Sequence, residues 1–235
     1  MKGTLHLIPV SLSDAPPSTW LPSAAQQVAG GLTRYIAENA KTARAFLGQM
    51  PLQQPIQAIK IDALSQRTND NTIIEWLDPL LHGQDVGLVS EAGCPAVADP
   101  GARVVMLAHQ MGVRVKPWVG PSSILLGLMA SGLEGQRFAF QGYAPVKPDA
   151  RKQAIRQWEQ TSKREDQTQI LIETPYRNQA MLETLTGSLN PQTRLCVASG
   201  LTGPHEWIRT EKISAWPKVQ VPDLSRSPTL FLFQA

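Results

Sequence analysis

VGLVSEAGCPAVADPG, from Val86 to Gly101, is the stretch of sequence that decides the fold of this chain. Its first four residues are apolar or glycine, which predicts a buried parallel β-strand. Small residues and Pro95 follow, and such residues let a ligand approach the backbone closely. Asp99 and Pro100 then predict a helix start, with Asp99 as the N-cap and Pro100 at the first helical position. A strand, a glycine loop and a helix in this order are typical of the ligand-binding edge of an α/β sheet.

A second segment repeats this arrangement further along the chain. Val113–Trp118 predicts the next strand, and Gly120-Pro121-Ser122-Ser123 predicts a turn with proline at the start of a helix. Each loop alone is equally well explained as an ordinary connection or helix cap. Two such loops about 30 residues apart, each at the carboxyl end of a strand, favour one shared ligand crevice.

The size and composition of the chain indicate a folded protein with one or two domains. It has 235 residues, of which 42% are hydrophobic. Strands are closely spaced in the second half, which indicates antiparallel pairs. We therefore predict an α/β fold with residues 1–118 as an N-terminal domain and residues 119–235 as a C-terminal domain. The N-terminal sheet is expected to be mostly parallel and the C-terminal sheet mixed.

Two local predictions concern the N-terminal half. The segment up to Pro22 is polar and rich in proline, which predicts a loop after a first strand at Thr4–Ile8. Asn71–Leu81 has apolar residues at helical spacing, which predicts a helix capped by Asn71.

Several classes of protein are disfavoured by what the sequence lacks. No apolar run reaches ~18 residues, so no membrane association is expected, and the first residues do not resemble a secretory signal. The two cysteines, Cys94 and Cys196, are far apart, and the four histidines are scattered, so we predict no metal site and a cytoplasmic location. No GxGxxG or GxxxxGK[ST] motif is present, which argues against the common nucleotide-binding folds.

Positive charge is concentrated in the segment from Lys147 to Arg164. The net charge of the chain is only +3, but this segment is strongly basic. The segment is explained equally well as an electrostatic footprint for RNA phosphates or as the solvated face of an amphipathic helix.

Three segments of the sequence resemble a known family. SEAGCPAVADPG at Ser90–Gly101, GVRVKPWVGPSSILLGLMASGL at Gly112–Leu133 and RFAFQGYAPVK at Arg137–Lys147 resemble the tetrapyrrole (corrin/porphyrin) methylase superfamily. The resemblance is greatest to the branch of bacterial small-subunit ribosomal RNA ribose 2′-O-methyltransferases. Glu173 and Arg177 also keep the spacing of that branch's YExxxR motif.

The sequence departs from this branch at four places, one of which is the AEDTR segment, present here as Ala37-Glu38-Asn39-Ala40-Lys41. The turn TPIGNL after the first strand is replaced by VSLSDA, the Arg-Glu pair expected within Ser199–Glu206 is missing, and the KGE motif near the end is Ser227-Pro228-Thr229. Because these departures fall where the family binds its substrate, the resemblance implies methyl-donor binding more strongly than a ribosomal substrate.

The resemblance implies a two-domain methyltransferase, usually a homodimer, with S-adenosylmethionine in the cleft between its domains. The proton of an RNA ribose hydroxyl would pass to a carboxylate, although each candidate carboxylate also has a structural explanation, and an ion pair with Arg177 is the favoured one for Glu173. The implied donor-binding residues are Pro9, Ser90, Ala92, Gly93, Val97, Ser122, Ser123, Thr174 and Leu201. The catalytic candidates are Glu91, Glu173 and Glu38, and the RNA-binding candidates are Lys147, Arg151 and Lys152.

Three functions therefore stay open from the sequence. The first is an S-adenosylmethionine-dependent methyltransferase that acts on ribosomal RNA in the small ribosomal subunit. The second is a methyltransferase for a small molecule such as a tetrapyrrole. The third is a relative that binds the donor without catalysis.

Overall fold

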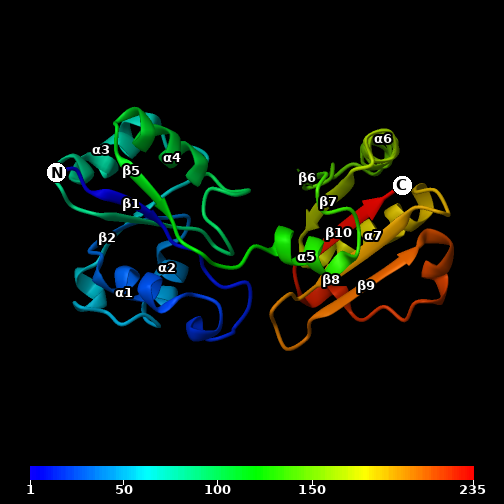
Figure 1. The fold of residues 1–235 in the computed structure, drawn as a ribbon, viewed down its shortest axis with the longest axis horizontal. Coiled ribbons are helices and arrows are strands. Elements are labelled where there is room, and N and C mark those ends of the chain that lie inside the picture. Colours follow the sequence, from blue (N-terminus) through cyan, green and yellow to red (C-terminus); the bar gives the residue numbers. More distant parts are fainter. The chain divides into compact units, whose positions relative to one another are not determined.

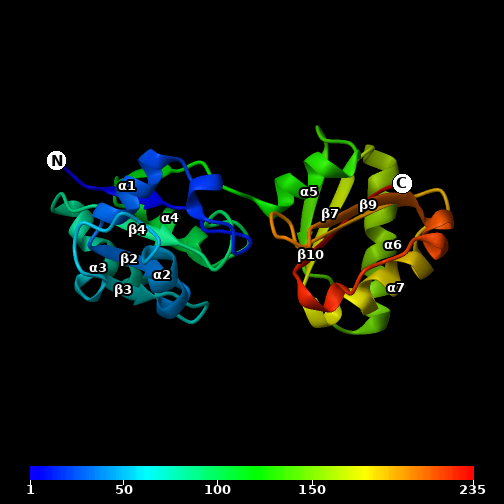
Figure 2. The ribbon, with the colours of Figure 1, turned by 90° about the horizontal axis from the view of Figure 1, so that it is seen from below.

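The computed structural model describes residues 1–235 and consists of two compact units, Met1–Ser122 and Ser123–Ala235, called unit 1 and unit 2 below. Figure 1 shows the blue-to-green ribbon of unit 1 and the green-to-red ribbon of unit 2, and Figure 2 shows both from a second direction. No helix is both long enough and apolar enough to span a lipid bilayer.

Unit 1 is built on a five-stranded sheet with the order β3-β2-β4-β1-β5, in which every pair is parallel. The strands are β1 (Thr4–Leu7), β2 (Arg34–Ala37), β3 (Lys60–Ala63), β4 (Val86–Val89) and β5 (Arg114–Pro117). All four residues of β4 are buried because helices cover both faces of the sheet. The parallel order brings the carboxyl ends of all five strands to one edge of the sheet.

Two pairs of helices cover the sheet of unit 1, one pair on each face (Figure 1). The helices are α1 (Ser23–Gly31), α2 (Ala40–Leu47), α3 (Asp70–Leu81) and α4 (Gly101–Gln110). Ala29 of α1 and Leu47 of α2 belong to one buried cluster. Leu77 of α3 and Val104 of α4 belong to the cluster on the other face.

Unit 2 contains a mixed five-stranded sheet with the order β6-β7-β10-β8-β9. The strands are β6 (Phe138–Gly142), β7 (Thr168–Glu173), β8 (Arg194–Ser199), β9 (Trp207–Lys212) and β10 (Thr229–Gln234), and the helices are α5 (Ser123–Ser131), α6 (Pro148–Glu165) and α7 (Asn178–Ser188). Only β6 and β7 pair in parallel, and the other three pairs are antiparallel. Helices α6 and α7 pack on one face of the sheet and α5 packs on the other.

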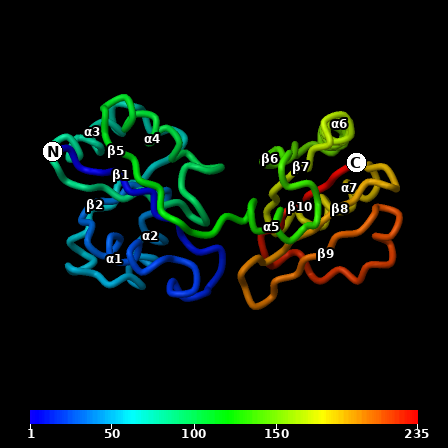
Figure 3. The backbone as a smooth tube through the Cα atoms, viewed as in Figure 1, coloured from blue at the N-terminus to red at the C-terminus, as the bar shows by residue number.

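The predicted fold class is confirmed, whereas several local predictions need correction. Helix α4 begins at Gly101, and α3 is capped by Asn69, whose side chain accepts a hydrogen bond from Thr72 at 2.9 Å, so Asn71 is not its cap. Strands β4 and β5 are not adjacent, since β1 lies between them. The backbone trace in Figure 3 shows the long segment that follows β1, and the helix α1 after it was not predicted.

Candidate functional site

Three loops meet at the carboxyl edge of the unit 1 sheet, after the neighbouring strands β4, β1 and β5. The loop after β1 is held to the loop after β4 by two backbone hydrogen bonds between Val10 and Gly93, of 2.9 and 3.2 Å. The loop after β5 packs on the same segment, because a Cβ atom on Gly120 would lie 2.3 Å from the Cβ of Pro9. Only glycine allows this approach, so the glycine of the predicted second loop serves packing within unit 1.

Gly93 brings the loops after β4 and β5 into direct contact. Its φ of +72° is a conformation that residues with side chains rarely adopt, and an added Cβ would lie 3.4 Å from the carbonyl oxygen of Pro121. The Sγ atom of the next residue, Cys94, lies 3.4 Å from the same oxygen. A ligand held by both loops would therefore lie along their shared rim, since the loops leave no slot at this contact.

The loop from Ser90 to Asp99 combines backbone strain with free hydrogen-bond donors. Ala96 and Ala98 have φ values of 68° and 62°, which is unusual for residues other than glycine and typical of functional loops. The Asp99 carboxylate accepts hydrogen bonds from the Ala96 and Gly101 amides, which stabilises the strained turn, and burial raises the Asp99 pKa. In this loop, the backbone N–H groups of Ala92, Cys94 and Ala98 form no hydrogen bond within the protein. Such a row of donors fits the carboxylate of an amino-acid ligand.

Two of the three candidate catalytic carboxylates lie together beside this loop. Glu38, directly after β2, accepts a hydrogen bond from the backbone amide of Glu91 at 3.3 Å. The exposed carboxylate of Glu91 in turn accepts a hydrogen bond from the Thr42 hydroxyl, at 2.5 Å. Burial raises the pKa of Glu38, and the negative charges of Asp99 and Glu91 act in the same direction. A carboxylate with a raised pKa is better suited to accept a proton near neutral pH.

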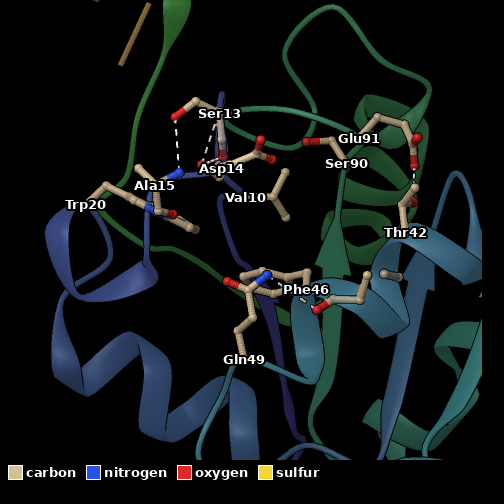
Figure 4. Close-up of a pocket in the computed structure, with 13 residues that line it drawn as sticks. Val10, Ser13, Asp14, Ala15, Trp20, Thr42, Phe46, Gln49, Ser90 and Glu91 are labelled. Carbon is tan, nitrogen blue, oxygen red and sulfur yellow. Dashed lines mark hydrogen bonds between the residues drawn. The ribbon is translucent and has the colours of Figure 1, made fainter. Parts of the chain in front are cut away.

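A pocket of about 560 Å³ opens next to Glu91, between the loop after β1, helix α2 and the loop after β4 (Figure 4). Phe46 from α2 and Trp20 form aromatic walls, and Asp14 and Gln49 bring polar groups. The lining residues are Val10, Ser11, Ser13, Asp14, Ala15, Trp20, Thr42, Ala43, Ala45, Phe46, Gln49, Ser90 and Glu91. Most of them were not predicted as site residues. The segment from Val10 to Trp20, which supplies six of the lining residues, lacks glycine and matches no motif. Only its position after the predicted first strand therefore indicates a site.

The third candidate carboxylate, Glu173, belongs to unit 2 and is buried. It is only 1% exposed, and its Oε2 atom forms an ion pair with Arg177 at 2.9 Å. Its Oε1 atom accepts a hydrogen bond of 2.8 Å from the amide of Thr174. The geometry therefore matches the structural explanation, in which Glu173 anchors the turn into α7.

The remaining predicted donor-binding residues are divided between the two units. Ser122 ends unit 1 and Ser123 begins unit 2, and both are partly exposed. Val97 is 49% exposed in the strained loop, whereas Leu201 is 6% exposed and belongs to the buried cluster beneath α5. Unit 1 thus brings together Pro9, Ser90, Glu91, Ala92, Gly93 and Glu38, and unit 2 holds Glu173, Thr174 and Leu201 at one edge of its sheet, where β7 and β8 both end.

The three predicted RNA-binding residues differ in exposure. Lys147 and Lys152 are exposed, at the start of α6 and on its surface. Arg151 is 9% exposed, and its Nε atom donates a hydrogen bond of 3.1 Å to Thr184 of α7. Arg151 therefore packs α6 against α7, and its guanidinium does not face solvent as a phosphate contact requires.

Solved structures of methyltransferases share this fold. The methyltransferase CobJ superposes with a TM-score of 0.62 at 16% identity, over 99% of this chain and 93% of that protein. Uroporphyrin-III C-methyltransferase from Thermus thermophilus gives a TM-score of 0.57 at 16% identity, over 100% of this chain and 93% of the other. These likenesses define the two-domain α/β fold of the chain.

The chain belongs to the family of tetrapyrrole (corrin/porphyrin) methylases, whose model matches residues 23–216. A ribosomal RNA small subunit methyltransferase I of Xylella fastidiosa is 34% identical over 157 residues, which cover 65% of this chain and 53% of that protein. The enzyme of the same name from Escherichia coli is 27% identical over 220 residues, or 92% of this chain and 73% of its own. The chain spans about half the length of several such relatives, with 53% and 45% in two of them.

Proposed function

We propose that this protein transfers a methyl group from S-adenosylmethionine to a ribose hydroxyl of RNA, with ribosomal RNA of the small subunit as the substrate. The observation that carries the proposal is the strained loop from Ser90 to Asp99 at the carboxyl edge of a parallel sheet, in a chain that belongs to a family of methylases. The names of the relatives support the choice of ribosomal RNA.

The donor is assigned to the rim formed by the loops after β1, β4 and β5. The free amides of Ala92 and Cys94 suit the carboxylate of its methionine part, and the exposed Val97 offers an apolar contact. The sulfonium of S-adenosylmethionine supplies an activated methyl group. The protein must therefore orient the donor and the acceptor for in-line transfer. Ser122, Ser123, Thr174 and Leu201 remain predicted donor contacts.

Glu91 and Glu38 are proposed to take the proton of the acceptor hydroxyl. Glu91 lies in the loop after β4, and Glu38 follows the neighbouring strand β2. Neither has a cationic partner, and a hydrogen bond joins the Glu91 amide to the Glu38 carboxylate. Glu173 is less suited to this role because it is 1% exposed and its carboxylate is already held by the ion pair with Arg177 and by the hydrogen bond from the Thr174 amide.

A transfer assay tests the function directly. The purified protein is incubated with methyl-labelled donor and extracts of cells that lack it, and the label is located by fractionation. We expect the label in ribosomal RNA, at a ribose. Label only in small molecules would instead support a tetrapyrrole-like substrate, and donor binding without any transfer would support a non-catalytic relative.

The difference between Lys152 and Arg151 provides a test of RNA binding. Lys152→Ala should weaken RNA binding and reduce the salt dependence of log K by about one unit, as expected for one lost phosphate contact. Arg151→Ala should leave this salt dependence unchanged and lower stability, because it removes a buried contact with Thr184. Equal salt dependence for the wild type and Lys152→Ala would contradict the assignment of α6.

The proposal includes a homodimer that works in the cytoplasm. The exposed apolar side chains of Leu125 and Met129 on α5 support self-association. Both cysteines are free thiols, which suits a reducing compartment. Light scattering after size-exclusion chromatography would show a mass of two chains, and a single-chain mass would remove the dimer from the proposal.

A further inference from the structure

A buried histidine on the inner strand β1 has a hydrogen-bond partner at each ring nitrogen. His6 is 6% exposed, and its Nε2 atom lies 3.2 Å from Oδ2 of Asp85, the residue before β4. Its Nδ1 atom lies 3.1 Å from Nε1 of Trp118, the residue after β5. An indole nitrogen can only donate, so Nδ1 of His6 carries no proton and accepts. Nε2 then carries the proton and donates to Asp85, and only this neutral tautomer satisfies both partners.

Trp118 is the first residue of the loop after β5, and its backbone and side chain are both fixed. Its amide donates to the carbonyl oxygen of Leu7 at 3.0 Å. Its ring is nearly parallel to the ring of His6, at 23° with centroids 6.1 Å apart. The Nζ atom of Lys116 lies 3.8 Å from the centroid of the Trp118 ring. The side chain of Trp118 thus ties the start of this loop to β1 through His6.

We propose that His6 is a pH-dependent positioning residue, which holds the Trp118 ring and the start of the loop after β5 only while it is neutral. A second proton on the imidazole has to bind Nδ1, because Nε2 already carries one. Two N–H groups would then point at each other where water has little access, so the hydrogen bond from Trp118 would break. Trp118 is half-buried, and its ring can turn towards solvent once it is released.

The groups around His6 favour its neutral form. Burial lowers the pKa of His6 below the ordinary value of 6.5, and the Asp85 carboxylate opposes this shift. The positive charges of Lys116 and Arg114 on β5 lower the pKa further. Tyr35 faces the same side from β2, and burial raises its pKa, so it stays uncharged. Helix α1 on this side has no ionisable side chain, and those of α2 are exposed. The hold is therefore intact above pH 6.5 and is lost as the pH falls through the lowered pKa of His6.

NMR of the full chain tests the hold of His6 on Trp118. The indole N–H signal of Trp118 is identified by its absence in Trp118→Phe. In the wild type this signal should shift as the pH is lowered from about 8 to about 5. His6→Asn keeps an oxygen where Nδ1 lies and cannot gain a proton, so its signal should stay in the bonded position throughout. His6→Leu has nearly the same shape as His6→Asn but no acceptor, so its signal should stay in the released position throughout.

Donor binding tests what the hold does, and this step rests on the proposed function because the loop after β5 belongs to the proposed donor rim. Calorimetry with S-adenosylmethionine should give an affinity about fivefold lower for His6→Leu than for His6→Asn at pH 8, as expected for one lost hydrogen bond. The wild type should match His6→Asn at pH 8 and lose affinity relative to it at pH 5. Ionisation of the donor itself affects all variants alike. His109→Gln, at an exposed position of α4, is the control and should behave as the wild type does.

The outcomes separate this inference from the proposed function. An indole signal that does not respond to pH in the wild type, or that is the same in His6→Asn and His6→Leu, would overturn the hold. Equal donor affinities in these two variants would overturn the positioning role, and methyl transfer to RNA by the wild type would then still support the proposed function. Conversely, a wild type that binds no donor at either pH would overturn the proposed function, while indole signals that differ as expected would support the hold.

Discussion

The carboxyl edges of the two sheets carry the same residue type in different settings. In unit 1, Glu38 and Glu91 follow β2 and β4, are half-buried and exposed respectively, and have no cationic partner. In unit 2, Glu173 ends β7, is 1% exposed and is paired with Arg177. The comparison teaches that a glutamate in a motif is a catalytic candidate only when its charge is left unmatched at an accessible edge.

The edge of unit 2 is further closed by a row of buried hydroxyl and amide groups. Thr229 pairs with Glu173 on one side and with Ser199 on the other, and its hydroxyl donates to Ser199 at 2.9 Å. Asn178 donates to Thr229 at 2.9 Å from the start of α7. These hydrogen bonds fix the buried polar side chains at this edge in place, so they tie the start of α7 to the ends of β8 and β10.

The largest expected effect breaks the ion pair of unit 2. Arg177→Met should lower the free energy of unfolding by about 3–5 kcal/mol, because it leaves the Glu173 carboxylate buried without its partner. Urea denaturation followed by circular dichroism measures this change.

Glu91→Gln is the counterpart in unit 1. It should change stability by less than about 1 kcal/mol, since Glu91 is exposed, while methyl transfer falls steeply. The comparison would fail if Arg177→Met were harmless to stability, or if Glu91→Gln unfolded the protein without affecting transfer per folded molecule.

The second expected effect distinguishes two glycines with similar backbone conformations. Gly93 and Gly132 have φ values of +72° and +67°, so replacement by alanine should cost each about 1–2 kcal/mol. No atom lies within 4 Å of an added Cβ at Gly132, whereas at Gly93 it would contact Leu12 and Pro121. Only Gly93→Ala should therefore weaken donor binding in calorimetry. Similar donor affinities for the two variants would show that the loop after β4 does not hold the donor.

The sequence predicted unit 1 well wherever local patterns decide the structure. The apolar run at Val86–Val89 and its glycine loop identified the central strand and the strained segment, because both signals are local. The insertion of β1 between β4 and β5 could not be predicted, since strand order depends on packing across the whole sheet. The pocket around Phe46 was missed for the same reason, because it combines segments that are distant in sequence. The burial of Arg151 also escaped prediction, since α6 contacts α7 through a basic residue.

A smaller effect is expected from the hydroxyl that holds Glu91. Thr42→Val removes the hydrogen bond to Glu91 and should cost about 1 kcal/mol or less in stability. Transfer activity should fall several-fold, because the Glu91 carboxylate loses its fixed orientation. Thr72→Val on α3 is the matched control, since the Thr72 hydroxyl forms no hydrogen bond with a carboxylate and only its backbone amide is bonded, to Asn69. Equal activity in the two variants would mean that Thr42 does not position Glu91.

The smallest effect concerns the ionisation of Glu38, and its sign follows from the direction of the pKa shift. Burial raises the Glu38 pKa above the ordinary value of 4.5, so the folded state binds this proton more tightly than the unfolded state. The resulting stabilisation is present in acid and is lost as the pH rises through the raised pKa.

The Gln side chain of Glu38→Gln cannot ionise, and it keeps an oxygen that accepts the hydrogen bond from the Glu91 amide. The variant should therefore match the wild type near pH 4 and become the more stable protein at pH 8, as measured by urea denaturation at both values. A variant that is less stable at pH 8 would show that the ionised Glu38 is stabilised by its neighbours, which would make it resemble Glu173 and remove the contrast between the two edges.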